Sequence, residues 1–133
     1  MKNKVLNKQP GVVHKVALYV RVASDTQTRP QKSPKTSAEN QEKTLRSALR
    51  ASDCNFELAG VFIDRALSGM SLNRPELRRL LHEIKAHKIT TVMVTESSQL
   101  SRNFTDLCTI RKLMARSGCS LQSLEEVLST EAY

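Results

Sequence analysis

Three polar stretches of the chain contain residue types that suit phosphoryl chemistry. They follow apolar runs and span residues 21–27, 64–69 and 96–102. Their hydroxyl, guanidinium and carboxyl groups, with Arg74 added, belong to Ser24, Ser68, Ser97, Ser98, Ser101, Arg21, Arg65, Arg74, Arg102 and Asp64. A hydroxyl nucleophile and fixed positive charge on the phosphate oxygens suffice for phosphoryl transfer, because little other covalent chemistry is required. Polar loops that merely face solvent would contain the same residue types. Spacing alone therefore leaves open whether these stretches form a reactive site or a solvated surface.

Asp64 also allows a different interpretation. A carboxylate at the end of a strand can accept a phosphoryl group, as in proteins of the receiver type. Such a site needs an acidic pair to hold Mg²⁺ after the first strand, and only Asp25 stands there. The missing acid argues against a phosphate-accepting carboxylate, and neither a metal site nor a cofactor is predicted.

The apolar pattern predicts strands that alternate with amphipathic helices. Short apolar runs predict buried strands at residues 15–22, 56–63, 89–95 and 119–124. This alternation predicts an α/β fold in three layers, with a mainly parallel sheet of four to five strands flanked by helices. Ligands bind at the carboxyl ends of parallel strands, so the three polar stretches are expected to meet at one edge of the sheet.

Capping and breaking residues delimit the helices between these strands. The first helix starts at "TSAE", which has the spacing of a capping box, and its core-facing positions include Gln41. The second helix opens at the pair Arg74 and Pro75, where proline is tolerated. The third helix is capped by Asn103 and ends before Gly118.

The composition indicates one domain with an affinity for polyanions. A chain of 133 residues with 39% hydrophobic residues is enough for a single core. Twenty-one Lys and Arg against thirteen Asp and Glu give a net charge of +8, which favours association with DNA or RNA. Aromatic residues make up only 4% and Trp is absent, which argues against a surface that stacks single-stranded bases.

Cysteine usage and hydropathy indicate a cytoplasmic protein. The three cysteines, Cys54, Cys108 and Cys119, are an odd number without a CxxC pair, so neither a disulfide framework nor a zinc site is predicted. The apolar runs are too short to cross a bilayer, and the opening "MKNKVLNKQPG" lacks the apolar stretch of a signal peptide. No membrane association is therefore expected.

Four segments of the chain form an ordered set of motifs. They read "YVRVAS", "ENQEKTLRSAL", "VFIDRALSGMSLNRPELRRLL" and "VTESSQLSRN". This set resembles the catalytic domain of the serine recombinases, the resolvase and invertase family, and the resemblance runs from about Val16 to about Ser129. Its most specific part is D-x-x-x-S-G followed by N-R-P-E-L, between Asp64 and Leu77.

The resemblance implies a resolvase-like fold and DNA strand exchange. In that family a serine hydroxyl attacks a DNA phosphodiester and forms a 5′-phosphoserine link, while arginines hold the phosphate and no metal is required. By this resemblance Arg21, Arg74 and Arg102 would stabilise the phosphate. Gln41 matches a glutamine near the active centre, and Asp64 matches the acid after the second core strand. The implied partner is double-stranded DNA, bound by a homo-oligomer or by a pair with another recombinase subunit.

The chain departs from the family motif at positions that carry the chemistry. The family nucleophile follows Y-x-R-V, and that position is Ala23, which has no hydroxyl. Ser24 comes next, but adjacent side chains of an extended strand point to opposite faces, so a one-residue bulge would be needed to re-aim it. Where the family reads Asp-Arg-Leu-Ser-Arg, this chain reads "SQLSR", with Ser98 and Gln99 in place of an acid and an arginine. Gln99 can donate a hydrogen bond but carries no charge.

Three functional hypotheses follow from these departures. The first is a serine site-specific recombinase-like domain with impaired catalysis, which would act as a non-catalytic DNA-binding or recombinase-partner module. The second is an active enzyme, either through Ser24 or with Ala23 as an engineered substitution. The third is an unrelated function on the same fold. Losing one donor to a transition-state oxyanion costs about 10² to 10³ in rate, so the combined departures favour the first hypothesis.

Composition and the resemblance together suggest how the chain is organised. Residues 1–14 would form a flexible basic tail, and residues 15–133 would form the recombinase catalytic-like domain with a flexible loop at about 24–37. The family's dimerisation helix and separate DNA-binding domain would follow the last residues, so both are expected to be absent. The integrase, resolvase and invertase subtypes are all compatible with these motifs.

Overall fold

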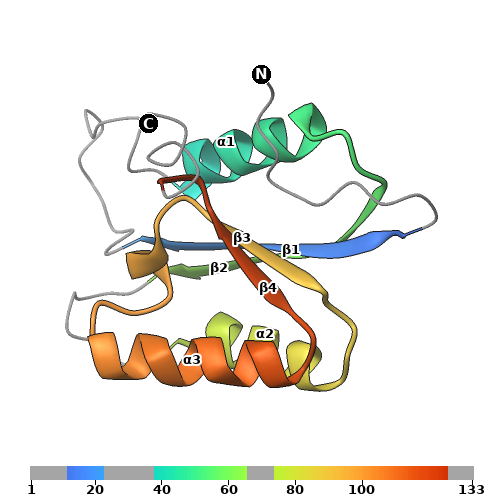
Figure 1. Cartoon of the computed structure of the whole chain (residues 1–133). Helices are drawn as coiled ribbons and strands as arrows, with labels where there is room; N and C mark the ends of the chain where they lie inside the picture. The colour runs from blue at the N-terminus through green and yellow to red at the C-terminus, as the bar shows by residue number, and fades with distance from the viewer. Residues whose placement is uncertain (1–11, 23–37, 66–73, 126–133) are drawn as a thin grey trace, which may run out of the picture.

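The described part of the chain forms a parallel four-stranded sheet with helices on both faces (Figure 1). The computed structural model describes residues 12–22, 38–65 and 74–125. Its elements in chain order are β1 (His14–Val22), α1 (Ala38–Ala51), β2 (Phe56–Arg65), α2 (Pro75–Lys85), β3 (Thr91–Val94), the 3₁₀ turn η2 (Ser97–Gln99), α3 (Phe104–Arg116) and β4 (Ser120–Ser123). The strand order is β2-β1-β3-β4, and each neighbouring pair is parallel. The predicted three-layer α/β fold is confirmed.

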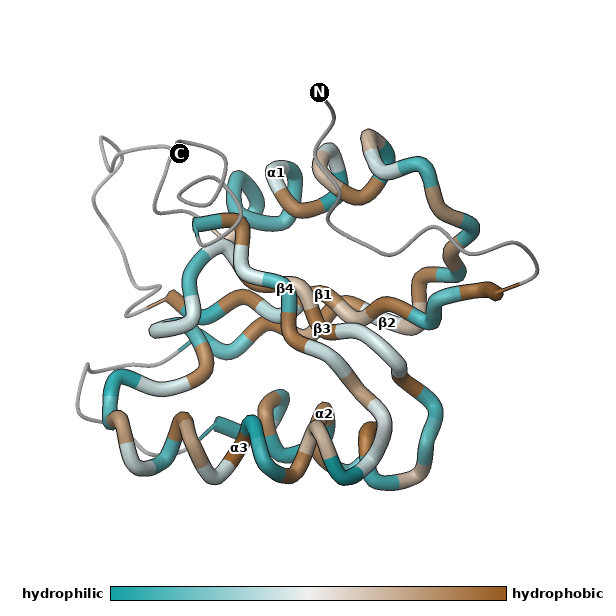
Figure 2. The backbone as a smooth tube through the Cα atoms, viewed as in Figure 1, coloured by the Kyte–Doolittle hydropathy of each residue, from teal (hydrophilic) through white to brown (hydrophobic). Residues whose placement is uncertain are grey.

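Strand β1 lies inside the sheet and is buried on both faces. Val16, Leu18 and Val20 join a core cluster with residues of α1, whereas Ala17 and Tyr19 join a second cluster with residues of α2 and α3. Side chains alternate between the faces of a strand, so a strand covered on both sides requires the continuous apolar run seen here. Figure 2 shows hydrophobic positions concentrated in the strands between the two helical layers.

Local sequence signals set the helix ends that were predicted. Pro75 lies in the first turn of α2, where its missing N–H costs no intrahelical hydrogen bond. The side chain of Asn103 caps α3 by accepting a hydrogen bond from the Asp106 N–H at 3.1 Å. Gly118 has a φ of 74°, a left-handed conformation that favours glycine after a helix.

Other expectations need correction or lie outside the described residues. Strand β3 is shorter than the predicted 89–95: it begins only at Thr91, and after Val94 the chain turns toward η2. Gln41 of α1, predicted to face the core, is half-buried and its Oε1 is buried. The expected loop at 24–37 and most of the expected tail fall outside the described ranges. Within those ranges, no helix is long and apolar enough to cross a membrane.

Replacing Gly118 by alanine is expected to lower the free energy of unfolding by about 1 kcal/mol, because an L side chain rarely adopts this φ. A Cβ at this position would meet no atom within 4 Å, so crowding adds nothing to the loss. Gly118→Asn should lose less of this free energy, because asparagine tolerates the left-handed region. Urea denaturation measures both variants, and an alanine variant as stable as the unmodified protein would contradict this account of the helix end.

Candidate phosphate-binding site

Arg74 joins three elements at the carboxyl edge of the sheet. It immediately precedes α2, and its Nη2 donates to the Tyr19 hydroxyl of β1 at 3.0 Å and to the Gln99 carbonyl of η2 at 2.7 Å. Its guanidinium carbon lies 5.7 Å from the centroid of the Tyr19 ring. Its Nε is buried and has no hydrogen-bond partner among the described residues. The two bonds of Nη2 therefore fix the guanidinium in place.

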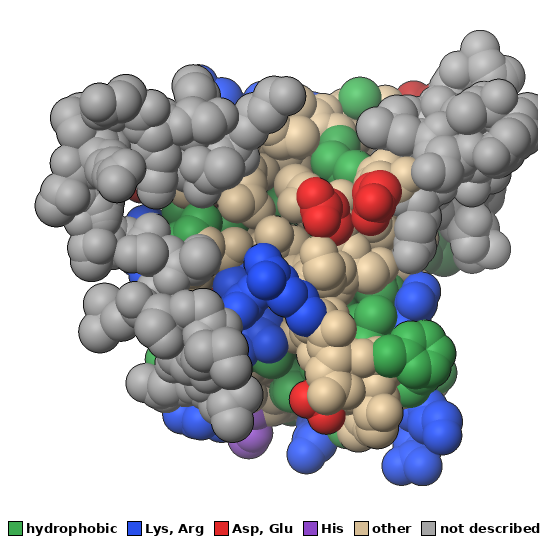
Figure 3. All heavy atoms as spheres, turned by 90° about the vertical axis from the view of Figure 1, so that its left-hand side faces the viewer, with side chains coloured by type: hydrophobic (Ala, Val, Ile, Leu, Met, Phe, Trp, Pro, Cys, Tyr) green, Lys and Arg blue, Asp and Glu red, His purple; other side chains and the backbone are tan. Residues whose placement is uncertain are grey.

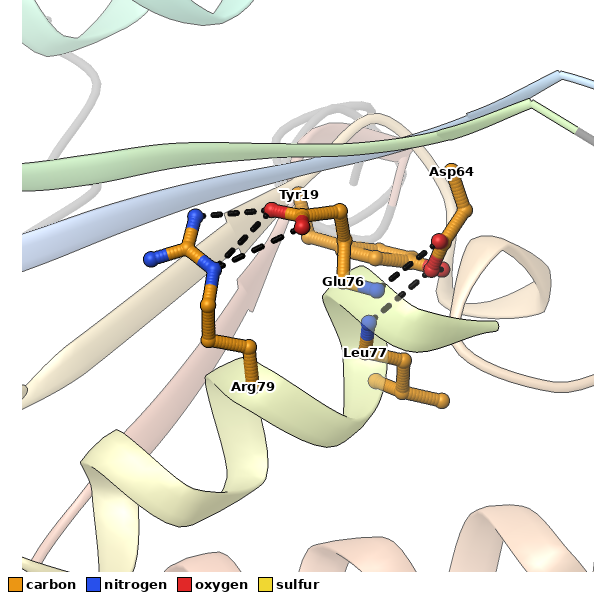
Figure 4. A network of polar contacts seen from close by, with 5 residues as sticks. All are labelled: Tyr19, Asp64, Glu76, Leu77 and Arg79. Carbon is orange, nitrogen blue, oxygen red and sulfur yellow. Dashed lines mark hydrogen bonds and ion pairs between the residues drawn. The ribbon is translucent and has the colours of Figure 1, made fainter. Parts of the chain in front are cut away.

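Asp64, at the end of β2, is the buried anchor of this arrangement (Figure 4). Only 3% of the residue is exposed. Its Oδ2 accepts from the Tyr19 hydroxyl at 2.8 Å and from the Leu77 N–H at 2.9 Å, and its Oδ1 accepts from the Glu76 N–H at 2.9 Å. A carboxylate that accepts from the first N–H groups of a helix satisfies unpaired donors and is stabilised by the helix dipole. Asp64 thus fixes the start of α2 against β1.

Tyr19 is a residue of the site that the sequence reasoning missed. Its hydroxyl donates to Asp64 and accepts from Arg74, so it connects the acid to the guanidinium. Burial raises the pKa of the Tyr19 phenol well above its usual range; the Arg74 charge opposes this rise and the Asp64 contact adds to it. The signal was a tyrosine inside an aliphatic strand, because a buried phenol hydroxyl requires a partner.

Arg21 and Arg102 complete a cluster of guanidinium groups with Arg74. Burial lowers the pKa of the Arg21 guanidinium, and the charges of Arg74 and Arg102 act in the same direction. The Arg21 Nε is buried without a hydrogen-bond partner in the described ranges, whereas Arg102 is exposed. Figure 3 shows Lys and Arg side chains gathered on the face toward which β1 ends. We call Arg21, Arg74 and Arg102 the arginine cluster.

Gln99 contacts the two half-buried members of the arginine cluster, Arg21 and Arg74. Its Oε1 accepts from the Arg21 N–H at 2.7 Å, and its carbonyl oxygen accepts from Arg74. The sequence suggested a hydrogen-bond donor at this position, but the side chain acts here as an acceptor. Its neighbour Ser98 donates to the Glu96 carboxylate at 3.0 Å, so this hydroxyl also has a local partner.

Other predicted residues do not join the cluster or cannot be placed. Arg65 pairs with Glu39 of α1 at 3.5 Å, and Ser101 bonds the backbone of Asn103 beside the start of α3. The Gln41 Oε1 is buried and has no partner within the described ranges. Ala23, Ser24 and Ser68 lie outside the described residues.

The arrangement suits a bound oxyanion. Guanidinium groups carry donors only, and their planar geometry matches phosphate oxygens. The negative charge of Asp64 acts on the Arg21 guanidinium less strongly than the positive charges of Arg74 and Arg102 do, so it compensates them only in part. The described residues contain no group of three or more His, Cys, Asp or Glu placed to hold a metal ion.

The family model for the resolvase N-terminal domain matches residues 16–132, so the chain belongs to that family. The resemblance to the catalytic domain of the serine recombinases is thereby confirmed. No curated protein matches the chain.

Solved structures of the same class are similar to this fold. The N-terminal catalytic domain of TP901-1 integrase is 26% identical with a TM-score of 0.72, over 85% of this chain and 79% of that one. A resolvase family site-specific recombinase from Streptococcus pneumoniae is 28% identical with a TM-score of 0.69, over 85% and 73%. The C-terminal catalytic domain of ISC1926 TnpA, an IS607-like serine recombinase, is 21% identical with a TM-score of 0.67, over 89% and 77%, and shows the shared fold.

The raised pKa of Tyr19 predicts a late step in the alkaline titration of the protein. The folded pKa exceeds the unfolded one, so the stability that this phenol contributes is present below about pH 10 and is lost as the pH rises further. Ultraviolet difference spectroscopy should show Tyr19 ionising only as the protein unfolds. Tyr19→Phe should remove that step, and a Tyr19 that ionises near pH 10 in the folded protein would contradict its burial.

Asp64→Ala is expected to lower the free energy of unfolding by about 3 kcal/mol, because it leaves a phenol and two helix N–H groups without their acceptor. Glu76→Ala is the matched control at the same helix start. It removes a carboxylate that pairs with Arg79 near the surface, which is worth less than about 1 kcal/mol. Equal losses for the two variants in urea denaturation would show that Asp64 does not anchor α2.

Proposed function

We propose that this chain is a serine recombinase-type domain that binds double-stranded DNA through a backbone phosphate at the arginine cluster and that, as its sequence stands, does not cleave it. The observation that carries the proposal is the convergence of Arg21, Arg74 and Arg102 beside the buried carboxylate of Asp64, which accepts three hydrogen bonds from protein groups. A net charge of +8 supports association with the polyanion. In this proposal residues 15–133 form the domain, and the basic residues before it add charge.

The absence of cleavage is inferred from the sequence around the cluster. Ala23 stands at the position of the family nucleophile and has no hydroxyl to attack phosphorus. The motif that carries an acid and an arginine in the family carries Ser98 and Gln99 here. The Gln99 side chain also bonds the Arg21 N–H, so its oxygen is directed at protein rather than at a ligand. Effects within one catalytic constellation do not simply add, but each change removes a group from the reaction.

A second candidate function is assembly with an active recombinase subunit. It is favoured by a confirmed family fold combined with a substituted nucleophile position. A domain of this kind would supply DNA contacts to a mixed oligomer without cutting its own strand. Light scattering of the protein with and without an active recombinase tests this function. A protein that stays monomeric when the recombinase is added would contradict it.

Arg102→Ala is expected to weaken binding to duplex DNA about tenfold at low salt, because a charge-assisted contact to phosphate is lost. The slope of log affinity against log salt should also fall by about one. Arg102 is exposed and lies outside the hydrogen-bonded network around Asp64, so folding should be unaffected. A fluorescence anisotropy titration at several salt concentrations measures both effects.

Arg50→Ala is the control for this experiment. Arg50 is exposed in the last turn of α1, so the variant loses the same charge outside the arginine cluster. Its binding should fall only slightly. If the two variants lose affinity equally, general charge attraction explains the binding and the cluster is not its site.

Ala23→Ser tests the assignment of the missing nucleophile. In this variant the new hydroxyl oxygen would form a bond to phosphorus while the bond from phosphorus to the 3′ oxygen breaks, and the hydroxyl proton would end on the released 3′-hydroxyl. Nicked suicide DNA and mass spectrometry should show a slow covalent adduct for Ala23→Ser and none for the unmodified chain. An adduct of the unmodified chain that Ser24→Ala abolishes would instead identify Ser24 as an active nucleophile.

A further inference from the structure

Gln99 supplies a hydrogen-bond acceptor to the end of β1, where β3 no longer pairs with that strand. Strand β3 pairs with β1 only from Val16 to Leu18, whereas β1 continues to Val22. Backbone N–H groups of a strand point alternately to its two neighbours, so those of Lys15 and Arg21 point to the same side. The Lys15 N–H donates to Thr90 Oγ1 at 2.8 Å, and the Arg21 N–H donates to Gln99 Oε1 at 2.7 Å. The Gln99 amide thus takes the position of a ladder acceptor at the carboxyl end of β1.

Gln99 also sets the position of Arg21 relative to Arg74. Its side-chain oxygen holds the backbone of Arg21, and its own carbonyl oxygen holds the Arg74 guanidinium at 2.7 Å. The same Nη2 of Arg74 also donates to the Tyr19 hydroxyl at 3.0 Å. One residue of η2 therefore connects two members of the arginine cluster through separate atoms.

We propose that Gln99 is a positioning residue, whose amide oxygen holds the end of β1 so that Arg21 and Arg74 converge on the same phosphate. This inference rests on the proposed function for the identity of the ligand. An arginine at this position could not make the contact, because a guanidinium has no acceptor for the Arg21 N–H. It would also add a fourth positive charge to three that already lie close together. A neutral acceptor satisfies both requirements.

The test compares Gln99→Met and Gln99→Arg with Thr90→Val. Gln99→Met keeps the length of the side chain and the net charge but removes the acceptor. Gln99→Arg removes the acceptor and adds a positive charge, so positioning and Coulomb attraction predict opposite results. Thr90→Val removes the same kind of side-chain bond to β1 at its amino end, which controls for lost stability.

Two measurements read out the effect. Hydrogen exchange of the Arg21 amide, followed by NMR in the free protein, should become about fivefold faster or more in both Gln99 variants and stay unchanged in Thr90→Val. Affinity for duplex DNA should fall about fivefold in Gln99→Met, as for the loss of one net hydrogen bond, and should also fall in Gln99→Arg despite the added charge. Thr90→Val should bind as the unmodified protein does.

The outcomes that overturn the proposal differ from those that overturn the proposed function. Tighter DNA binding by Gln99→Arg, unchanged binding by Gln99→Met, or an equal loss in Thr90→Val would show that Gln99 does not position the cluster. If the unmodified protein binds no DNA, the proposed function fails. The exchange rate of the Arg21 amide then still decides whether Gln99 holds β1, because an unchanged rate in Gln99→Met overturns that contact.

Discussion

The buried carboxylate of Asp64 is the interaction on which the rest of the site depends. An anion with 3% exposure is costly to desolvate unless its oxygens are well bonded. Here the partners are the Tyr19 phenol from the sheet and two N–H groups at the start of α2. The same bonds that satisfy the charge therefore fix α2 at the carboxyl edge, and Arg74 immediately precedes that helix. Asp64 and Arg74 are parts of one network, linked by the Tyr19 hydroxyl.

Charge and hydrogen bonding together explain why the guanidinium groups of the arginine cluster suit an anion. Arg74 uses one of its terminal nitrogens to bond protein oxygens, and its Nε has no partner among the described residues. Arg21 bonds the protein through its backbone N–H, which leaves its guanidinium beside those of Arg74 and Arg102. Three guanidinium groups whose charges act on one another favour an oxyanion between them. Gln99 supports the arrangement without adding charge.

The fold could be predicted from the sequence because the signals that define its strands and helix ends are local. The apolar run of β1, Pro75 at the start of α2, and Gly118 after α3 each restrict the backbone on their own. The meeting of Arg21, Asp64 and Arg74 at one edge was also predictable, since parallel strands bring their carboxyl ends together. The contacts among these residues were not predictable, because they join positions far apart in the sequence.

Tyr19 and Gln99 show where sequence reasoning stopped. Tyr19 lies in an apolar run, so the sequence indicates only a core residue. Its hydroxyl links Asp64 to Arg74 in the structure. The sequence identifies Gln99 only as a residue without a positive charge. In the structure its Oε1 accepts a hydrogen bond from the Arg21 N–H, 78 residues away in sequence. Only the early end of β3 reveals that the Arg21 N–H needs an acceptor from another element. A residue type identifies the possible bonds, and the topology selects among them.

In the proposed function the arginine cluster binds a DNA phosphate without breaking the strand. NMR of the ¹⁵N-labelled arginine side chains during titration with a short DNA duplex tests it most directly. We expect the Nε–H signals of Arg21, Arg74 and Arg102 to shift together and to recover at high salt, with no covalent adduct by mass spectrometry. Shifts confined to arginines outside the cluster, or an adduct with the unmodified chain, would contradict it.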